Sequence, residues 1–131
     1  MWSAEAVLVC ALSLLPRTAA SPPIQLVDAP PAGVSSNAEA FVIAGEARIY
    51  LVTSTEMFRR ARQANDRCGD LEAHRWIAAV IVHEAWHVLH GADEAGAYTA
   101  QLMALTQLGA GPDHMAYAAV RRSMRSVVDE R

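Results

Sequence analysis

The feature that most constrains this chain is an apolar segment of helical pattern that carries three ionisable side chains. Residues 76–89 are apolar on nearly every side of a helix, so this helix is expected in the middle of a fold and not on its surface. Within the segment lies the run His83-Glu84-x-x-His87. Burying these groups without partners costs on the order of several kcal/mol. The sequence therefore requires a compensating partner.

A metal ion is the partner that the spacing favours. Residues four apart on a helix lie one turn above each other, so His83 and His87 project side by side and can both reach one Zn²⁺ ion. Glu84 points about 100° further round the helix, which places it beside the open coordination position of the ion. The alternative is two core histidines that are hydrogen-bonded to backbone or carboxylate groups. We interpret the run as a zinc site because it lies inside an apolar helix.

The third ligand is selected by the turn that follows the helix. Gly91 and Asp93 have the residue types that end one helix and cap the next, which predicts a helical hairpin. The first turn of the second helix then packs back against the first and brings Glu94 to the ion. The predicted metal ligands are His83, His87 and Glu94, and Asp93 is the rival for the third position.

Three histidines fall outside this ligand set. His90 lies on the same helical face as His83, but about 10.5 Å along the axis from it, which is too far for both to bind one ion comfortably. His90 is therefore expected to support the site from behind the ligands or to lie at the surface. His74 and His114 are expected to face solvent.

The rest of the chain predicts a β-hairpin and further helices. Residues 41–43 and 47–52 are β-rich runs on either side of a turn at Gly45. Thr53 and Glu56 have the spacing of a capping box, so a helix is expected to begin there. Three more helices are expected over 71–90, from 94 to about 108 and from 114 on, capped by Asp70, Asp93 and Asp113. The predicted fold class is a mainly helical α+β domain.

The N-terminal segment 1–20 has the organisation of a secretion signal. An apolar stretch over 6–15 precedes Pro16 and the small residues at 18–20, which predicts export to the periplasm or the medium. One alternative is that the segment is a buried N-terminal helix. Another, suggested by the acidic Glu5, is a mis-assigned start, in which case the protein would be cytoplasmic. Cleavage after residue 20 would leave Cys68 as the only cysteine and exclude an internal disulfide.

Length and charge limit the remaining possibilities. The proline-rich segment 21–33 predicts an extended linker or edge segment, and the domain proper is expected over 34–131. A chain of 131 residues has room for one domain with one site. A net charge of −3 argues against nucleic-acid binding. The sequence contains no uninterrupted apolar run of about 18 residues, so a stable membrane span is not expected.

The motif and the residues after it carry a resemblance. His83-Glu84-x-x-His87 followed by Asp93-Glu94-Ala95-Gly96-Ala97-Tyr98 resembles the gluzincin class of zinc metallopeptidases, and in particular small bacterial proteins with a short gap to the glutamate. The strong match spans about 80–108, with weaker support from 49–60, which is under half of the chain. The resemblance implies a minimal zincin-like fold in which a glutamate from the second helix completes the zinc site.

The resemblance also implies an activity and roles for residues. Zinc-dependent hydrolysis of peptide bonds is implied, with a peptide or protein substrate and with Glu84 as the general base that moves a proton from water to the leaving amine. Tyr98, one turn beyond Glu94, is a candidate donor to the oxyanion, and its alternative role is packing. The strand over 48–53 resembles the edge strand on which such peptidases bind an extended substrate.

Two functions without catalysis remain as alternatives. A non-catalytic zinc-binding protein would use the same ligands but would not need Glu84. An interaction module would carry the motif as a degenerate remnant. The metal content of the purified protein distinguishes the interaction module, which would hold no zinc, from the peptidase and the non-catalytic zinc-binding protein.

Overall fold

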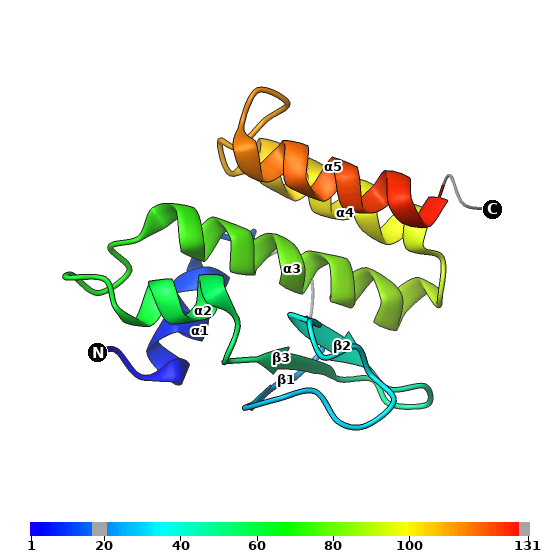
Figure 1. The fold of residues 1–131 in the computed structure, drawn as a ribbon, viewed down its shortest axis with the longest axis horizontal. Coiled ribbons are helices and arrows are strands. Elements are labelled where there is room, and N and C mark those ends of the chain that lie inside the picture. The colour runs from blue at the N-terminus through cyan, green and yellow to red at the C-terminus, as the bar shows by residue number, and fades with distance from the viewer. Residues whose placement is uncertain (17–20, 129–131) are drawn as a thin grey trace.

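The structure is a computed structural model that describes residues 1–16 and 21–128. Over these residues the chain forms five helices and one three-stranded sheet, which confirms the predicted mainly helical α+β class (Figure 1). In chain order the elements are α1 (Ala4–Ser13), β1 (Ile24–Val27), β2 (Ala40–Val42), β3 (Ile49–Val52), α2 (Glu56–Arg62), α3 (Leu71–His90), α4 (Glu94–Gln107) and α5 (Met115–Val128).

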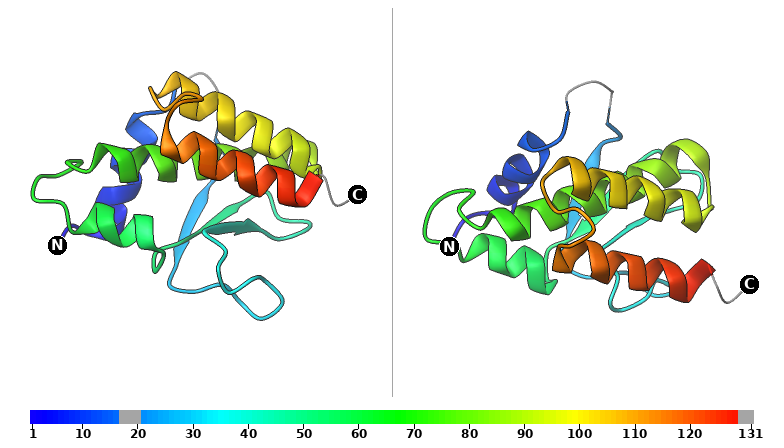
Figure 2. Two further views of the ribbon diagram at one scale, coloured as in Figure 1. Left: turned by 45° about the horizontal axis from the view of Figure 1, so that its top comes forward. Right: turned by 90° about the horizontal axis from the view of Figure 1, so that it is seen from above.

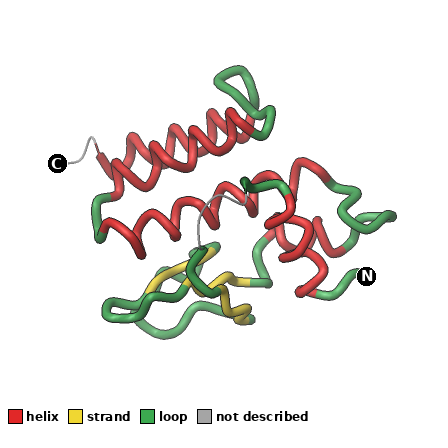
Figure 3. The backbone as a smooth tube through the Cα atoms, turned by 180° about the vertical axis from the view of Figure 1, so that it is seen from behind, coloured by secondary structure: helices red, strands yellow, loops and turns green. Residues whose placement is uncertain are grey.

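Helix α3 is the centre of the molecule. The sheet lies on one side of it and the α4–α5 pair on the other (Figures 1, 2 and 3). The Asp70 side chain caps α3 by accepting a hydrogen bond from the Ala73 amide, and the helix ends at Gly91, which has a φ of 92°. A positive φ is tolerated by glycine, so the residue type at position 91 stops the helix. The helix is central, as predicted, but its burial is confirmed only in part: it is buried through 77–81 and at His83, half-buried over 84–88 and exposed at Leu89.

Two hydrophobic clusters bury the two sides of α3. The first joins α3 to α1, α2 and the sheet, and it contains the fully buried side chains of Ile49, Phe58 and Ile81. The second joins α3 to α4 and α5 through Leu105 and Val120. Among the described residues, no helix combines the length and the apolar character that crossing a membrane requires.

The sheet has the order β1-β3-β2, with β3 in the middle. The hairpin of β2 and β3 is antiparallel, as predicted, and pairs Phe41 with Tyr50, whose rings stack with their centroids 5.0 Å apart. β1 comes from the proline-rich segment 21–33 and pairs in parallel with β3. The prediction that 48–53 forms an edge strand is therefore wrong, because β1 and β2 cover both edges of β3.

Helix α2 begins later than the sequence predicts. Its N-cap is Thr55, whose side chain makes no capping hydrogen bond. The predicted capping box of Thr53 and Glu56 is wrong, because the Thr53 hydroxyl donates instead to the Val27 carbonyl at the end of β1, at 3.3 Å. A long-range contact between β1 and the end of β3 thus displaces a local capping preference.

The N-terminal helix belongs to the first hydrophobic cluster. Val7 and Ala11 of α1 are fully buried against it, and Cys10 forms a disulfide with Cys68 in the connection between α2 and α3. In the chain that begins at Met1, α1 is thus the buried N-terminal helix of the alternative interpretation. The small residues of the predicted cleavage site, at 18–20, lie outside the described residues. Export stays a prediction, and cleavage there would remove the disulfide.

Candidate metal centre

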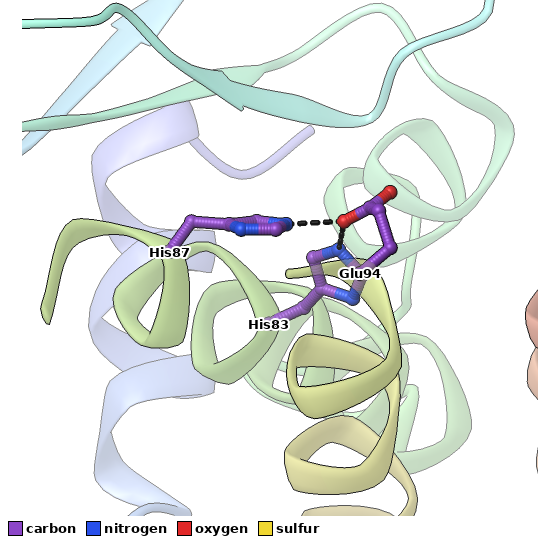
Figure 4. A group of neighbouring side chains, drawn as sticks. All are labelled: His83, His87 and Glu94. Carbon is purple, nitrogen blue, oxygen red and sulfur yellow. Dashed lines mark hydrogen bonds and ion pairs between the residues drawn. The ribbon is translucent and has the colours of Figure 1, made fainter. Parts of the chain in front are cut away.

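The structure brings His83, His87 and Glu94 together at the junction of α3 and α4 (Figure 4). One nitrogen of each imidazole and one carboxylate oxygen all lie within 4.8 Å of one another. Glu94 Oε1 lies 3.2 Å from His83 Nε2, and the same oxygen contacts His87 Nε2. These three side chains could hold a metal ion, and they are the three that the sequence predicts as ligands.

The turn between the helices chooses Glu94 over Asp93. The Asp93 side chain caps α4 by accepting from the Ala95 amide at 3.1 Å, and it is exposed. Glu94 is the first residue of α4, so its side chain points back over the preceding turn, toward the end of α3. The rival ligand of the sequence prediction is thus engaged as a helix cap and lies outside the converging group.

A close approach of α4 to α3 at Gly96 supports this placement. A Cβ atom at position 96 would lie 2.2 Å from a ring carbon of Trp86, so only glycine fits without displacing that ring. The Trp86 indole also stacks on the His90 imidazole, with ring centroids 4.5 Å apart. His90 is exposed and lies outside the converging group, in agreement with the expectation that it is not a ligand.

Hydrogen bonds on the far side of each ring set the direction of the two imidazoles. His83 Nδ1 donates to Gln101 Oε1 at 2.8 Å, and His87 Nδ1 donates to the Gly91 carbonyl at 2.7 Å. Because carbonyl oxygens only accept, each ring carries its proton on Nδ1. In a neutral imidazole the Nε2 lone pair then faces Glu94 without a proton in between. Three lone pairs converge on one point, which is the arrangement that a cation completes.

Burial favours the neutral form of the first histidine. Desolvation lowers the pKa of His83, against the opposing effect of the Glu94 carboxylate and of the Gln101 hydrogen bond. An imidazole that resists protonation keeps the Nε2 lone pair that a metal ion needs. The geometry and the electrostatics of His83 therefore agree.

Gln101 is the residue of this site that the sequence analysis missed. It is buried in α4, and its amide holds the His83 ring. Gln101 follows Glu94 by seven residues, which is about two helical turns, so both lie on one face of α4. A polar residue seven positions after Glu94, on the inward face of the helix, is the sequence feature that could have identified Gln101 as part of the site.

Glu84 lies beside the converging group and not in it. It lines two cavities that flank His83, one of about 560 Å³ next to β2 and one of about 160 Å³ next to α4. Burial raises the pKa of Glu84 to about 7, although the neighbouring His87 acts in the opposite direction. A carboxyl group with such a pKa populates both protonation states near neutral pH, which suits a group that accepts and returns a proton.

Tyr98 lines the smaller cavity together with Glu84. Its ring packs edge-on against the His83 imidazole, with ring centroids 4.6 Å apart. Burial, followed by the nearby carboxylates, raises the pKa of Tyr98, so its hydroxyl keeps its proton at neutral pH. The ring has the packing role that the sequence analysis considered, and the donor role stays a prediction.

Two histidine predictions are wrong. His74 does not face solvent: it is buried in α3, where its Nδ1 donates to the Asp70 carbonyl one turn earlier, at 2.7 Å. His114 is half-buried, and its Nδ1 accepts from the Ala116 amide at the start of α5. His114 thus performs the capping that the sequence predicts for Asp113. In both cases one ring nitrogen bonds to nearby backbone, whereas His74 Nε2 is buried without a hydrogen-bond partner among the described residues.

No family model, curated protein or solved structure matches this chain. The resemblance to gluzincins therefore remains an expectation from one motif and its spacing. The geometry of the structure supports a group of two imidazoles and one carboxylate that could hold a metal ion. A partly buried carboxyl group and two cavities lie directly beside it.

Proposed function

We propose that this protein is a zinc-dependent peptidase that hydrolyses peptide bonds in peptide or protein substrates. The observation that carries the proposal is the convergence of three lone pairs, from His83, His87 and Glu94, next to the cavities that Glu84 lines. Two imidazole nitrogens and one carboxylate oxygen are a donor set that suits zinc. Three protein ligands leave one coordination position free, which is typical of catalytic zinc sites and not of structural ones.

The side chains around the group support distinct steps of the reaction. A bound zinc ion supplies Lewis acidity that activates water and polarises a carbonyl group. Glu84 takes a proton from the attacking water on its carboxylate and returns it to the leaving amine. The Tyr98 hydroxyl donates to the oxygen on which negative charge develops. Gln101 and the Gly91 carbonyl hold the two imidazoles in the tautomer that keeps Nε2 free.

The position of β2 supports an extended chain as the substrate. β3 is covered on both edges, whereas β2 is an edge strand. Residues 40–46 line the larger cavity at Glu84 together with both imidazoles. A peptide that adds to the outer edge of β2 would thus pass beside the proposed general base. We therefore assign substrate binding to the edge of β2, in place of the strand over 48–53 that the resemblance implies.

Replacement of Glu84 tests the activity. Glu84→Gln keeps the size and polarity of the side chain but cannot accept the proton, so hydrolysis is expected to fall roughly a hundredfold to ten-thousandfold while zinc stays bound. The measurement is metal content and cleavage of a diverse peptide library on the same samples. Asp28→Asn, which removes an exposed carboxylate just after β1, is the matched control and should retain wild-type activity.

Two outcomes would contradict the proposal. Loss of zinc from Glu84→Gln would show that Glu84 is a ligand and not the base. A wild-type protein that holds zinc and cleaves no peptide, with no change in Glu84→Gln, would replace the peptidase by a non-catalytic zinc-binding module.

A further inference from the structure

A large cavity lies next to the proposed reaction centre. Its volume is about 760 Å³, and the walls come from the residues before β2 and from α2, α3 and α5. It shares Asn37, Glu39 and Trp76 with the small cavity that reaches His83 and Glu84. A group bound at Glu39 or Trp76 is therefore open both to the large cavity and to the proposed reaction centre.

Glu39 is held firmly at this junction. The Val52 amide of β3 donates to the Glu39 carbonyl at 3.0 Å, which fixes the backbone at the beginning of β2. On the side chain, the Trp76 indole N–H donates to Glu39 Oε2. Among the residues that the structure describes, no hydrogen bond engages the other carboxylate oxygen, Oε1. One oxygen is thus positioned by the protein while the other is available to a ligand.

The carboxylate has no cationic partner within the described part of the chain. Arg60, on the wall of the large cavity, is paired with Asp70 at 3.1 Å, and Arg122 on the same wall makes no ion pair with Glu39. Burial raises the pKa of Glu39, and the Glu56 carboxylate adds to the rise. A partly buried negative charge of this kind is stabilised by a cation, and the indole N–H of Trp76 holds the carboxylate in position to receive one.

We propose that Glu39 and Trp76 form a binding site for a positively charged group of the substrate, adjacent to the peptide bond that is cleaved. The inference rests on the proposed function and adds a specificity to it. The recognised chemistry is an ammonium or guanidinium group that donates to Glu39 Oε1. It can come from the free N-terminus of a peptide or from an arginine or lysine side chain, and the experiment separates these sources.

The test compares charged and neutral peptides of one shape. N-acetylated, C-amidated hexapeptides carry one arginine or its neutral isostere citrulline at each position in turn, and a neutral hexapeptide is tested with a free and with an acetylated N-terminus. A charge-assisted hydrogen bond corresponds to roughly tenfold to a hundredfold in kcat/KM. We expect a preference of this size for the charged member of one pair type, which identifies the source of the cation.

Glu39→Gln is expected to abolish that preference, because glutamine keeps an acceptor for Trp76 Nε1 and removes only the charge. Asp28→Asn is the matched control, since Asp28 is an exposed carboxylate after β1 that lines neither the large nor the small cavity. The control should keep the preference. An equal loss in both variants would indicate a general electrostatic effect and would overturn the inference. If Glu39→Gln does not fold, Glu39→Asp, which withdraws the carboxylate by one methylene, must reduce the preference.

Calorimetric binding of the same peptides separates this inference from the proposed function. If no peptide is cleaved but charged peptides bind more tightly than neutral ones in a Glu39-dependent way, the site stands and the peptidase does not. If peptides are cleaved with equal kcat/KM for charged and neutral members, the peptidase stands and the site does not. A wild-type protein that neither cleaves nor binds charged peptides in preference overturns the site as well.

Discussion

Asp93 and Glu94 are neighbouring acidic residues with different roles. The role of each is decided by its position relative to the first residue of α4. Asp93 is the residue before α4, so its short side chain turns back to the free amide of Ala95. Glu94 is one position further on, and its longer side chain reaches the two imidazoles. The structure thus decides between two ligands that the sequence leaves as rivals.

The different tasks predict different effects of alanine. Glu94→Ala is expected to lower zinc affinity by a large factor, because one of three ligands is lost. Asp93→Ala is expected to keep stoichiometric zinc and to lower the free energy of unfolding by about 1 kcal/mol, the typical value of an N-cap. Zinc content after dialysis and urea unfolding of both variants measure this. Tight zinc binding by Glu94→Ala, or its loss in Asp93→Ala, would contradict the ligand assignment.

At the scale of elements, α1 lies within the predicted export signal and also packs into the hydrophobic core. Its Val7 and Ala11 are buried against the first hydrophobic cluster, and Cys10 is joined to Cys68 across 58 residues of sequence. Disulfides form and persist in oxidising compartments. Cleavage after residue 20 would nevertheless remove both the helix and the bridge. An oxidising compartment would thus preserve the disulfide of α1, whereas cleavage of the signal would remove α1 altogether.

The disulfide is expected to stabilise the chain that begins at Met1. Closing a loop of 58 residues restricts the unfolded chain by about 4 kcal/mol, so Cys10→Ser with Cys68→Ser should lower the free energy of unfolding by a value of this order. Denaturant unfolding with and without a reducing agent measures it, and the double variant, which has no thiols, should not respond to reduction. Identical unfolding of the oxidised and reduced protein would show that α1 is not stapled in solution.

The N-terminus of the protein in its host decides the export question. A chain that starts near Ser21 retains one cysteine and must fold without α1, as the signal interpretation requires. A chain that starts at Met1 and contains no free thiol retains the helix and the disulfide. Intact mass together with a thiol titration distinguishes the two forms.

At the scale of the whole molecule, the candidate metal group joins the central helix α3 to the start of α4. His83 and His87 belong to α3, which both clusters enclose, and Glu94 begins the helix pair that covers only one side of it. An ion bound by all three residues would tie α4 to α3 in addition to their packing. Because the three side chains converge only in the folded chain, binding of an ion would stabilise the folded state alone.

Zinc is therefore expected to raise the stability of the entire domain. Binding to the folded state contributes about 4 kcal/mol when free zinc is about 1,000 times its Kd, so a chelator should lower Tm and added zinc should restore it. Calorimetric melting at several free zinc concentrations measures the shift. His83→Ala is the control and should melt at one temperature in zinc and in chelator. An equal Tm of the wild-type protein with and without zinc would contradict the proposed site.

The patterns that the sequence predicted correctly are local ones. The caps Asp70 and Asp93, the stop at Gly91 and the hairpin around Gly45 depend on residues within a few positions of each other, and the structure contains them all. The pairing of His83 with His87 depends on helical periodicity in the same way. Local geometry also brings Glu94 close, because the turn after α3 is short.

What only the tertiary structure decided are contacts between segments far apart in sequence. Thr53 bonds to Val27 and not to its own helix, and β1 occupies an edge that 48–53 was expected to offer. Glu39 meets Trp76 across 37 positions. Periodicity and capping describe neighbours a few residues apart, whereas strand order and the shared wall of a cavity depend on which surfaces the whole chain buries together. The sequence by itself thus determined the candidate ligands, and the tertiary structure decided what surrounds them.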